Sequence, residues 1–323
     1  MTIPPQPENT PPGHTQPGHF PAEPGPDALA DERRRLTGLA YRLLGSLAEA
    51  EDAVQETYAR WYAMSPQQQE DIESPGAWRT TVASRICLDQ LRSARVRRER
   101  YVGDWIPEPL PERTDWISGR PADPAAGDPA DRVTLDESVS MAFLVVLETM
   151  SPAERVAFIL HDVFRYPFAD IAGVVGRTPA ACRQLASAAR RRISAAQPPA
   201  APPARQAAII RDFRQAWEAK DIEALVGLLD PDITLVTDGG GQALASPVPI
   251  AGLAQITEVL SVLTARTADT MTFLECAVNG QPGLIARENG VTVTVFAFQF
   301  SGDKITRIWA VRNPDKLRPW SAD

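Results

Sequence analysis

The chain has 323 residues, enough for two or three domains that each bury a hydrophobic core. Its 44% hydrophobic and 23% charged residues are typical of a folded globular protein, and no run of about eighteen apolar residues could span a membrane. The N-terminus lacks the basic and apolar regions of a secretory signal, and three widely spaced cysteines argue against a disulfide framework or a zinc site. We therefore expect a cytoplasmic protein that contacts no membrane and binds no metal.

The net charge of −8 at pH 7 conceals two strongly basic segments. Seven arginines against two acidic residues occur between positions 79 and 100, and five arginines with no acidic residue occur between 177 and 192. Separated basic segments in an acidic chain are expected where two helices bind phosphates and the remaining surface stays acidic. The average charge therefore does not exclude a nucleic-acid partner.

The first part of the chain divides into a tail, a helical domain and a linker. Residues 1–26 contain nine prolines and are expected to form a disordered tail. Apolar residues at three-and-four spacing indicate a first helical domain over 27–102. Its helices are expected over about residues 27–44, 47–64 and 74–100. Residues 103–130 show no periodicity and are expected to form a linker.

Helical periodicity returns over 131–196 and indicates a second helical domain. Its helices are expected over about residues 135–150, 151–164, 168–176 and 178–193. A proline-rich linker over 197–204 follows it.

Residues 205–323 combine helical segments with β-branched runs and are expected to form an α+β domain and a short C-terminal tail. The order helix, helix, strand, helix and then several strands favours a strongly bent antiparallel sheet around helices. The alternation in VTVTVFAFQF, residues 291–300, predicts a long strand with one face packed and the other facing a cavity or solvent.

The segment 168–193 has the spacing of a helix-turn-helix, with the turn at Gly176. The second helix has a cap followed by proline, polar residues near its start that could reach base edges, and later arginines that could hold phosphates. The candidate DNA-binding residues here are Thr178, Arg183, Gln184, Arg190 and Arg191. The alternative is an αα-hairpin with a solvated arginine face.

The first helical domain carries a more specific pattern, an acidic amphipathic helix followed by a helix of the form WxxTxAxxxxxDxLR. The matching residues are Trp78, Thr81, Ala83, Asp89, Leu91 and Arg92. On this pattern residues 36–98 resemble region 2 of an extracytoplasmic-function sigma factor, and the helix-turn-helix resembles region 4 of the same family. The resemblance implies two all-α domains in a promoter-specificity subunit of bacterial RNA polymerase.

The resemblance also implies which residues meet polymerase and promoter DNA. The polymerase core would be bound at its clamp helices and its flap, and the core-binding residues would be Asp52, Gln55, Glu56 and Arg60. The residues that read the minus-ten element as single strand would be Trp78, Arg79, Arg85, Arg92 and Arg95, since unstacked bases need π-faces and a basic groove. The helix-turn-helix residues would read the minus-thirty-five element. Core packing of Trp78, and a solvated face for Arg92 and Arg95, are the alternatives.

Residues 205–312 resemble the SnoaL-like (NTF2-like) domain at the C-terminus of a SigJ-like subgroup of these sigma factors, on the segments VTDGGG at 236–241 and NPDKL at 313–317. Free-standing relatives are enzymes that use Asp or His as a base and Tyr or a protonated Asp to polarise a carbonyl, but here every histidine and tyrosine precedes residue 167. We therefore expect regulation or sensing of a small-molecule ligand, without catalysis or a cofactor.

Two other functions stay open. One is a small-molecule isomerase or cyclase-type enzyme with a DNA-binding appendage, and the other is a one-component repressor that never contacts polymerase. Transcription with purified polymerase core distinguishes them from a sigma factor.

The segment YVGDWIPEPL, residues 101–110, places large apolar side chains just after a basic helix. Exposing them would forgo about 1.5–3 kcal/mol of burial for each large side chain, so a partner surface is expected. We expect Trp105, Ile106 and Pro107 to pack on the α+β domain. The candidate contact residues there are Asp238, Gly239, Gly240, Gly241, Asn313, Pro314 and Asp315. Packing on the first helical domain itself is the alternative.

Overall fold

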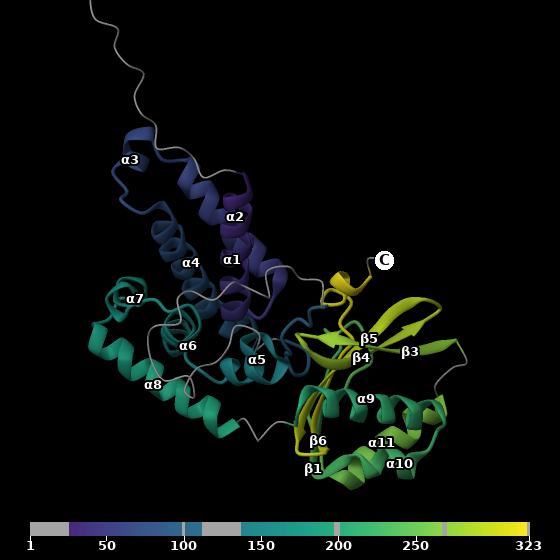
Figure 1. Cartoon of the computed structure of the whole chain (residues 1–323). Helices are drawn as coiled ribbons and strands as arrows, with labels where there is room; N and C mark the ends of the chain where they lie inside the picture. The colour runs from purple at the N-terminus through teal and green to yellow at the C-terminus, as the bar shows by residue number, and fades with distance from the viewer. Residues whose placement is uncertain (1–25, 99–100, 112–136, 197–200, 267–269, 322–323) are drawn as a thin grey trace, which may run out of the picture.

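The protein is described by a computed structural model that covers residues 26–98, 101–111, 137–196, 201–266 and 270–321. Two helical domains lie beside a C-terminal domain built on a sheet (Figure 1). The predicted fold class is confirmed, because two all-α domains precede an α+β domain with a curved, mixed sheet. The predicted tail lies outside the described residues except for Pro26. None of the described helices is long and apolar enough to cross a membrane.

The first helical domain consists of α1 (Pro26–Leu44), α2 (Leu47–Tyr62), α3 (Pro66–Glu70) and α4 (Pro75–Arg98). Gly45 has a φ of 71° and separates α1 from α2. Ser46 caps α2, since its side chain accepts a hydrogen bond from the Glu49 amide. Ser65 and Gln68 form a reciprocal capping box at α3. Local side chains therefore decide where these helices begin.

The second helical domain contains the short 3₁₀ helix η2 (Glu137–Val139), α5 (Met141–Glu148), α6 (Pro152–Phe158), the π-helical turn η3 (Ile159–Val163), α7 (Phe168–Val175) and α8 (Pro179–Ala196). Ser151 and Glu154 form a capping box at α6. Gly176 ends α7 in the left-handed conformation, and the Thr178 hydroxyl accepts from the Ala181 amide at 3.2 Å. The helix-turn-helix predicted from these residues is present.

The two helical domains share one hydrophobic core. The same cluster of buried residues includes Leu36 and Leu43 of α1, Cys87 of α4, Phe158 of α6 and Ile171 of α7. Helix α4 packs against both α6 and α7. The two domains therefore form one packed body in this conformation.

The C-terminal domain contains α9 (Pro203–Glu218), α10 (Ile222–Gly227), β1 (Leu229–Asp238), β2 (Ile250–Ala251), α11 (Leu253–Arg266), β3 (Met271–Val278), β4 (Gln281–Glu288), β5 (Val291–Ser301), β6 (Lys304–Val311) and the 3₁₀ helix η4 (Arg318–Trp320). The strand order is β2-β1-β6-β5-β4-β3. The pairings are antiparallel as expected except for one, because β1 pairs with β6 in parallel. The hairpin that joins β5 to β6 returns the chain alongside β1 in the same direction.

Both faces of the sheet are covered (Figure 1). On one face Phe298 and Phe300 of β5 pack against α9, α10 and α11. On the other, Val295 and Ala297 of β5 belong to a second cluster, completed by groups from outside the sheet. These groups are Ile106, Met141 of α5, Leu317 and Trp320. The expectation that one face of this strand meets a cavity or solvent is therefore wrong, because α5, Ile106 and the C-terminal tail pack there.

Candidate nucleic-acid and interdomain sites

Helix α2 presents an exposed polar face to solvent. Its buried side carries Val54, Thr57 and Trp61. The exposed side carries the predicted core-binding residues Asp52, Gln55, Glu56 and Arg60. Glu56 and Arg60 form an ion pair one turn apart. This face is accessible to a partner in the conformation described.

Helix α4 buries Arg79 and half-buries Trp78, its first two predicted DNA-binding residues. Arg79 is 5% exposed and binds the Glu32 carboxylate through two hydrogen bonds of 3.1 and 2.6 Å. Its guanidinium lies 4.9 Å from the Trp61 ring, and the Trp78 ring centre is 5.3 Å from that ring. Arg79 was expected to contact DNA, but in this conformation it is buried and paired with Glu32. Trp78 is half-buried and packs on Trp61, which was the alternative for this residue.

The remaining predicted residues of α4 are exposed or turned toward the second helical domain. Arg85 donates to the Gly173 carbonyl of α7 at 2.8 Å. Arg92 is exposed and pairs with Asp89 at 3.1 Å. The side chain of Arg95 lies outside the described residues. In this conformation the Arg85 side chain is therefore hydrogen-bonded to the helix-turn-helix.

Helix α8 exposes the start of the helix-turn-helix recognition surface. Thr178, Arg183 and Gln184 are exposed, and the Arg183 guanidinium lies 5.2 Å from the Phe168 ring of α7. A groove of about 880 Å³ runs along this surface and is bounded on the other side by Arg92 of α4. Arginines from both helical domains therefore line one concave surface.

The later arginines of α8 have different environments. Arg190 donates two hydrogen bonds, of 2.9 and 2.6 Å, to the same oxygen of the buried Asp162 carboxylate. Arg191 is exposed and lines the groove. Arg190 therefore neutralises a buried carboxylate, while Arg191 is accessible to a phosphate.

Buried arginines also bridge the two helical domains. Arg155 of α6 donates to the Leu43 carbonyl at the end of α1 at 2.9 Å and pairs with Glu148 at 2.7 Å. Arg42 of α1 donates to the Ser138 hydroxyl at 2.6 Å. Burial lowers the pKa of Arg155, whose guanidinium lies beside the Glu148 carboxylate. Such buried, paired charges favour one relative position of the two helical domains over others.

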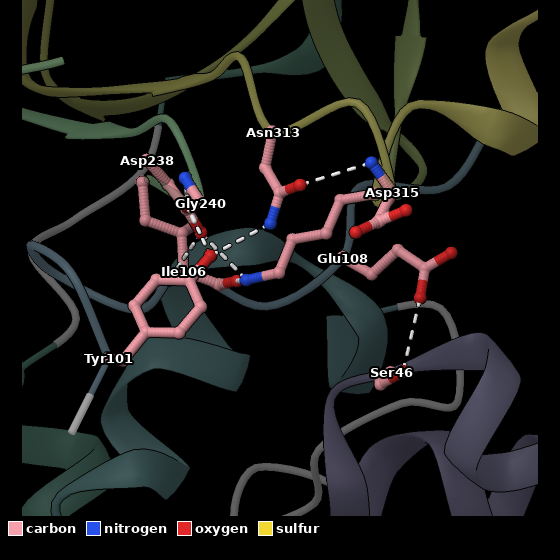
Figure 2. Close-up of polar contacts among 9 residues, drawn as sticks. Ser46, Tyr101, Ile106, Glu108, Asp238, Gly240, Asn313 and Asp315 are labelled. Carbon is pink, nitrogen blue, oxygen red and sulfur yellow. Dashed lines mark hydrogen bonds and ion pairs between the residues drawn. The ribbon is translucent and has the colours of Figure 1, made fainter. Parts of the chain in front are cut away.

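A buried carboxylate organises the contact between the segment 101–111 and the C-terminal domain (Figure 2). Asp238, at the end of β1, is 1% exposed. It accepts hydrogen bonds from the Tyr101 hydroxyl at 2.6 Å, the Ile106 amide at 3.2 Å and the Gly240 amide at 3.0 Å. Lys316 pairs with it at 2.7 Å. These residues, with Asn313, are called the domain junction below.

Lys316 ties the C-terminal tail to the same segment. Its ammonium group donates to the Ile106 carbonyl and lies 4.3 Å from the Trp105 ring. Asn313 donates to the Tyr101 hydroxyl at 2.8 Å. A Cβ added at Gly240 would overlap the Asn313 side chain, so the glycine permits the close approach of turn and tail.

The other residues predicted at this contact surround the junction. Gly239 packs on the Ala243 carbonyl, and a Cβ at Gly241 would meet Val102. Pro314 and Asp315 are exposed. Asp315 accepts from Gln242 at 3.0 Å and from Arg318 at 2.6 Å, outside the buried network.

The segment 101–111 also contacts the first helical domain. Pro107 is buried, and a Cβ at Gly45 would lie 2.8 Å from the Trp105 ring. The Glu108 amide donates to the Gly45 carbonyl at 2.8 Å, and its carboxylate accepts from the Leu47 amide at 2.8 Å. The segment therefore packs on both partners that the sequence left as alternatives. It is an ordered strap between them rather than a free linker at these residues.

Burial sets the protonation of three groups on this strap. It raises the pKa of the Tyr101 hydroxyl, to which the bond with Asp238 adds, so the tyrosine remains a donor. Burial, and then the charge of Asp238, raises the pKa of the Asp104 carboxyl. Burial also raises the pKa of Glu108, although its hydrogen bonds oppose the shift.

Sequence reasoning missed Tyr101 and Lys316 at the junction. It also missed Tyr41 and Asn279 beside it, where the Asn279 side-chain nitrogen donates to the Tyr41 hydroxyl at 2.7 Å. Tyr101 and Lys316 lie inside the two segments that were singled out, so a search for polar groups in them would have found both. Asn279 belongs to an Asn-Gly turn that predicts a hairpin and nothing about its neighbours.

The interior of the C-terminal domain is filled by aromatic side chains. Trp217 of α9 packs on Phe273 and Phe296, with ring centres 5.4 and 6.3 Å apart, and Phe213 meets Phe298 edge-on at 5.5 Å. Asp232 is exposed, and Asp238 faces the junction. Among the described residues no group of three or more metal-ligating side chains occurs.

Comparison with known proteins matches both helical domains to one family. Residues 29–97 match sigma-70 region 2, and residues 140–193 match sigma-70, region 4. The chain is 36% identical over 297 residues to the ECF RNA polymerase sigma factor SigJ of Mycobacterium tuberculosis (strain ATCC 25618 / H37Rv), covering 88% of this chain and 90% of that protein. The chain therefore belongs to the extracytoplasmic-function family of RNA polymerase sigma factors.

Two further likenesses extend over nearly the whole chain. The probable ECF RNA polymerase sigma factor SigI of M. tuberculosis (strain CDC 1551 / Oshkosh) is 34% identical over 292 residues, covering 90% of this chain and 94% of that protein. The crystal structure of the M. tuberculosis sigma factor SigJ has a TM-score of 0.70 and 31% identity, covering 91% of this chain and 98% of that one. The likeness thus includes the C-terminal domain.

Proposed function

We propose that this sigma factor binds the RNA polymerase core in the cytoplasm and directs it to promoters, and that its C-terminal domain controls when it can do so. The exposed face of α2 would bind the clamp helices, and the second helical domain would contact the flap. Arg85 and Arg92 would meet the minus-ten element, and Arg183, Gln184 and Arg191 the minus-thirty-five element. Their exposure supports these roles, and Arg85 would also have to leave the Gly173 carbonyl.

The observation that carries the regulatory part is the shared core of the two helical domains. The two promoter elements are named for positions about 25 base pairs apart, or about 85 Å of duplex. Modules that pack directly on one another, with Arg85 bonded to the helix-turn-helix, cannot lie on both elements at once. The closed arrangement must therefore open before initiation. The strap and the junction oppose opening.

We propose no catalytic role for the C-terminal domain. Its interior is occupied by the aromatic cluster, and its buried Asp238 is engaged with Lys316. A general base needs reach to a substrate proton in a pocket, and this carboxylate serves the domain contact instead. Neither a small-molecule ligand nor the isomerase alternative gains support from this arrangement.

Transcription with purified polymerase core tests the proposal. Full-length protein is compared with a version ending before Asn313, which loses Lys316 and the tail. We expect promoter-specific transcripts that depend on the sigma factor. The shortened version should give more of them, because it lacks the junction that opposes opening. Equal levels would refute control by the junction, and no transcripts from either would refute the sigma-factor role in this system.

A second arm tests the polymerase contact. Asp52→Lys with Glu56→Lys reverses the charge of the exposed face of α2, and Glu223→Lys on α10 is the matched control. We expect the α2 variant alone to lose binding to the core, since opposite charges steer and specify such contacts. Unchanged transcription by the α2 variant would favour a repressor that acts without polymerase.

A further inference from the structure

Two Asn-Gly turns in the C-terminal domain look equivalent in sequence and differ in their surroundings. Asn279 and Gly280 join β3 to β4, and Asn289 and Gly290 join β4 to β5. Both asparagines have a positive φ, of 53° and 50°, as a tight hairpin requires. Asn289 is exposed, whereas Asn279 is 0% exposed. A turn residue that is fully buried must satisfy its amide within the protein.

Asn279 makes four hydrogen bonds to groups outside its own domain. Its amide donates to the Leu110 carbonyl at 2.9 Å, and its side-chain oxygen accepts from the Leu110 amide at 3.0 Å. Its side-chain nitrogen donates to the Tyr41 hydroxyl at 2.7 Å and to the Val139 carbonyl at 2.9 Å. One residue thus contacts α1, the strap and the start of the second helical domain.

Tyr41 extends this set of contacts inside the first helical domain. It is 0% exposed, and its hydroxyl donates to the Glu108 carbonyl at 2.7 Å while accepting from Asn279. Burial raises its pKa, so the hydroxyl keeps its proton. The hydroxyl therefore donates to one of these partners and accepts from the other, and loss of either partner removes a buried hydrogen bond.

The Asn279 contacts are separate from the domain junction. The junction holds Tyr101 and Ile106 at the end of β1, while Asn279 holds Leu110 at the β3–β4 turn, where Pro111 also pairs with Val278. In the sheet β1 and β3 are separated by β6, β5 and β4. The strap is therefore fastened to the C-terminal domain at the junction, at Asn279 and, between them, at Pro109, whose carbonyl accepts from the Trp320 indole at 2.8 Å. Only the junction carries the VTDGGG and NPDKL segments.

We propose that Asn279 is a positioning residue that sets the spacing of the two promoter-reading modules, by fixing Tyr41 of the first helical domain and Val139 of the second to the same amide. The inference rests on the proposed function for its effect on transcription, and on geometry alone for its effect on domain arrangement. Loss of the Asn279 side chain removes the amide that ties Tyr41 to Val139, so the two modules separate more easily while the junction stays intact.

The test compares Asn279→Gly with Asn289→Gly in the full-length protein. Glycine keeps the positive φ of each hairpin, so both variants retain the turn and differ in what the lost amide contacted. Hydrogen exchange of the segment 106–111 and solution scattering report the arrangement. We expect exchange at Leu110 to rise about tenfold or more in Asn279→Gly, with a larger radius of gyration, and no change in Asn289→Gly. Equal behaviour of the two variants would overturn the proposal.

A second substitution and a functional readout complete the test. Tyr41→Phe removes one hydroxyl from the same set of contacts, so combining it with Asn279→Gly should add less than its effect alone. Full additivity would contradict a shared contact. Promoter transcripts from Asn279→Gly should rise above wild type, because fewer closed molecules compete with the open form. Faster exchange with unchanged transcripts would overturn the positioning role. If the wild-type protein gave no transcripts, the proposed function would be contradicted, and the exchange result alone would test Asn279.

Discussion

Replacing Lys316 by methionine tests the ion pair at the centre of the domain junction. The Lys316 side chain is 9% exposed and the Asp238 side chain 0% exposed, so methionine would fill a similar volume and leave a buried carboxylate without its cation. Removing one partner of a buried pair costs about 3–5 kcal/mol. Tyr101, Ile106 and the Gly240 amide still donate to Asp238, which favours the lower end, about 3 kcal/mol.

Hydrogen exchange at the Ile106 amide measures this cost locally, which suits a chain of several domains. A loss of about 3 kcal/mol corresponds to exchange about 150-fold faster in Lys316→Met. Lys304→Met, at an exposed lysine, is the control and should stay within about 0.5 kcal/mol of wild type. Adding Asp238→Asn to Lys316→Met removes the stranded charge and should recover much of the loss. If the two changes were additive, or if Lys316→Met matched its control, the reasoning would be refuted.

Three further substitutions probe other contacts. Gly240→Ala should destabilise by about 1–3 kcal/mol more than Gly290→Ala in urea unfolding, because both have a positive φ and only the first would overlap Asn313. Asp104 has a raised pKa when docked, so docking should strengthen as pH falls from 7 toward 4. Asp104→Asn should reduce this dependence, leaving the part that the raised pKa of Glu108 supplies, and slow strap exchange about twofold at pH 7; an unchanged pH profile would contradict it. Arg190→Ala should cost about 2–3 kcal/mol of stability by stranding Asp162. Arg191→Ala should leave stability within about 0.5 kcal/mol and lower the salt slope of DNA binding by about 1, and the reverse pattern would exclude these roles.

Secondary structure was predictable where it depends on neighbours in the sequence. The turn at Gly176 and the cap at Thr178 define the helix-turn-helix from residues within one helical turn. The strand predicted over 291–300 is present as β5, Val291–Ser301. The parallel pairing of β1 and β6 was not predictable in this way, because it depends on how the β5–β6 hairpin folds back on a strand more than sixty residues earlier.

The candidate sites were predictable only in outline. The apolar strap needed a partner on grounds of burial, and Ile106, Asp238 and Asn313 do lie in one network. The sequence did not identify Lys316 as the cation that neutralises Asp238, because this pairing depends on the path of the C-terminal tail after β6. A sequence shows that a carboxylate is present and leaves open whether it becomes buried.

The sequence by itself determined the elements, the family pattern and the two basic helices, since these follow from spacing along the chain. Only the tertiary structure decided between chemically identical neighbours. Of two adjacent arginines, Arg190 is paired with Asp162 and Arg191 is exposed. Of two Asn-Gly turns, one is solvated and the other, at Asn279, is buried against both helical domains. The physical reason is that burial and partners are properties of three-dimensional packing, which brings together residues more than two hundred positions apart.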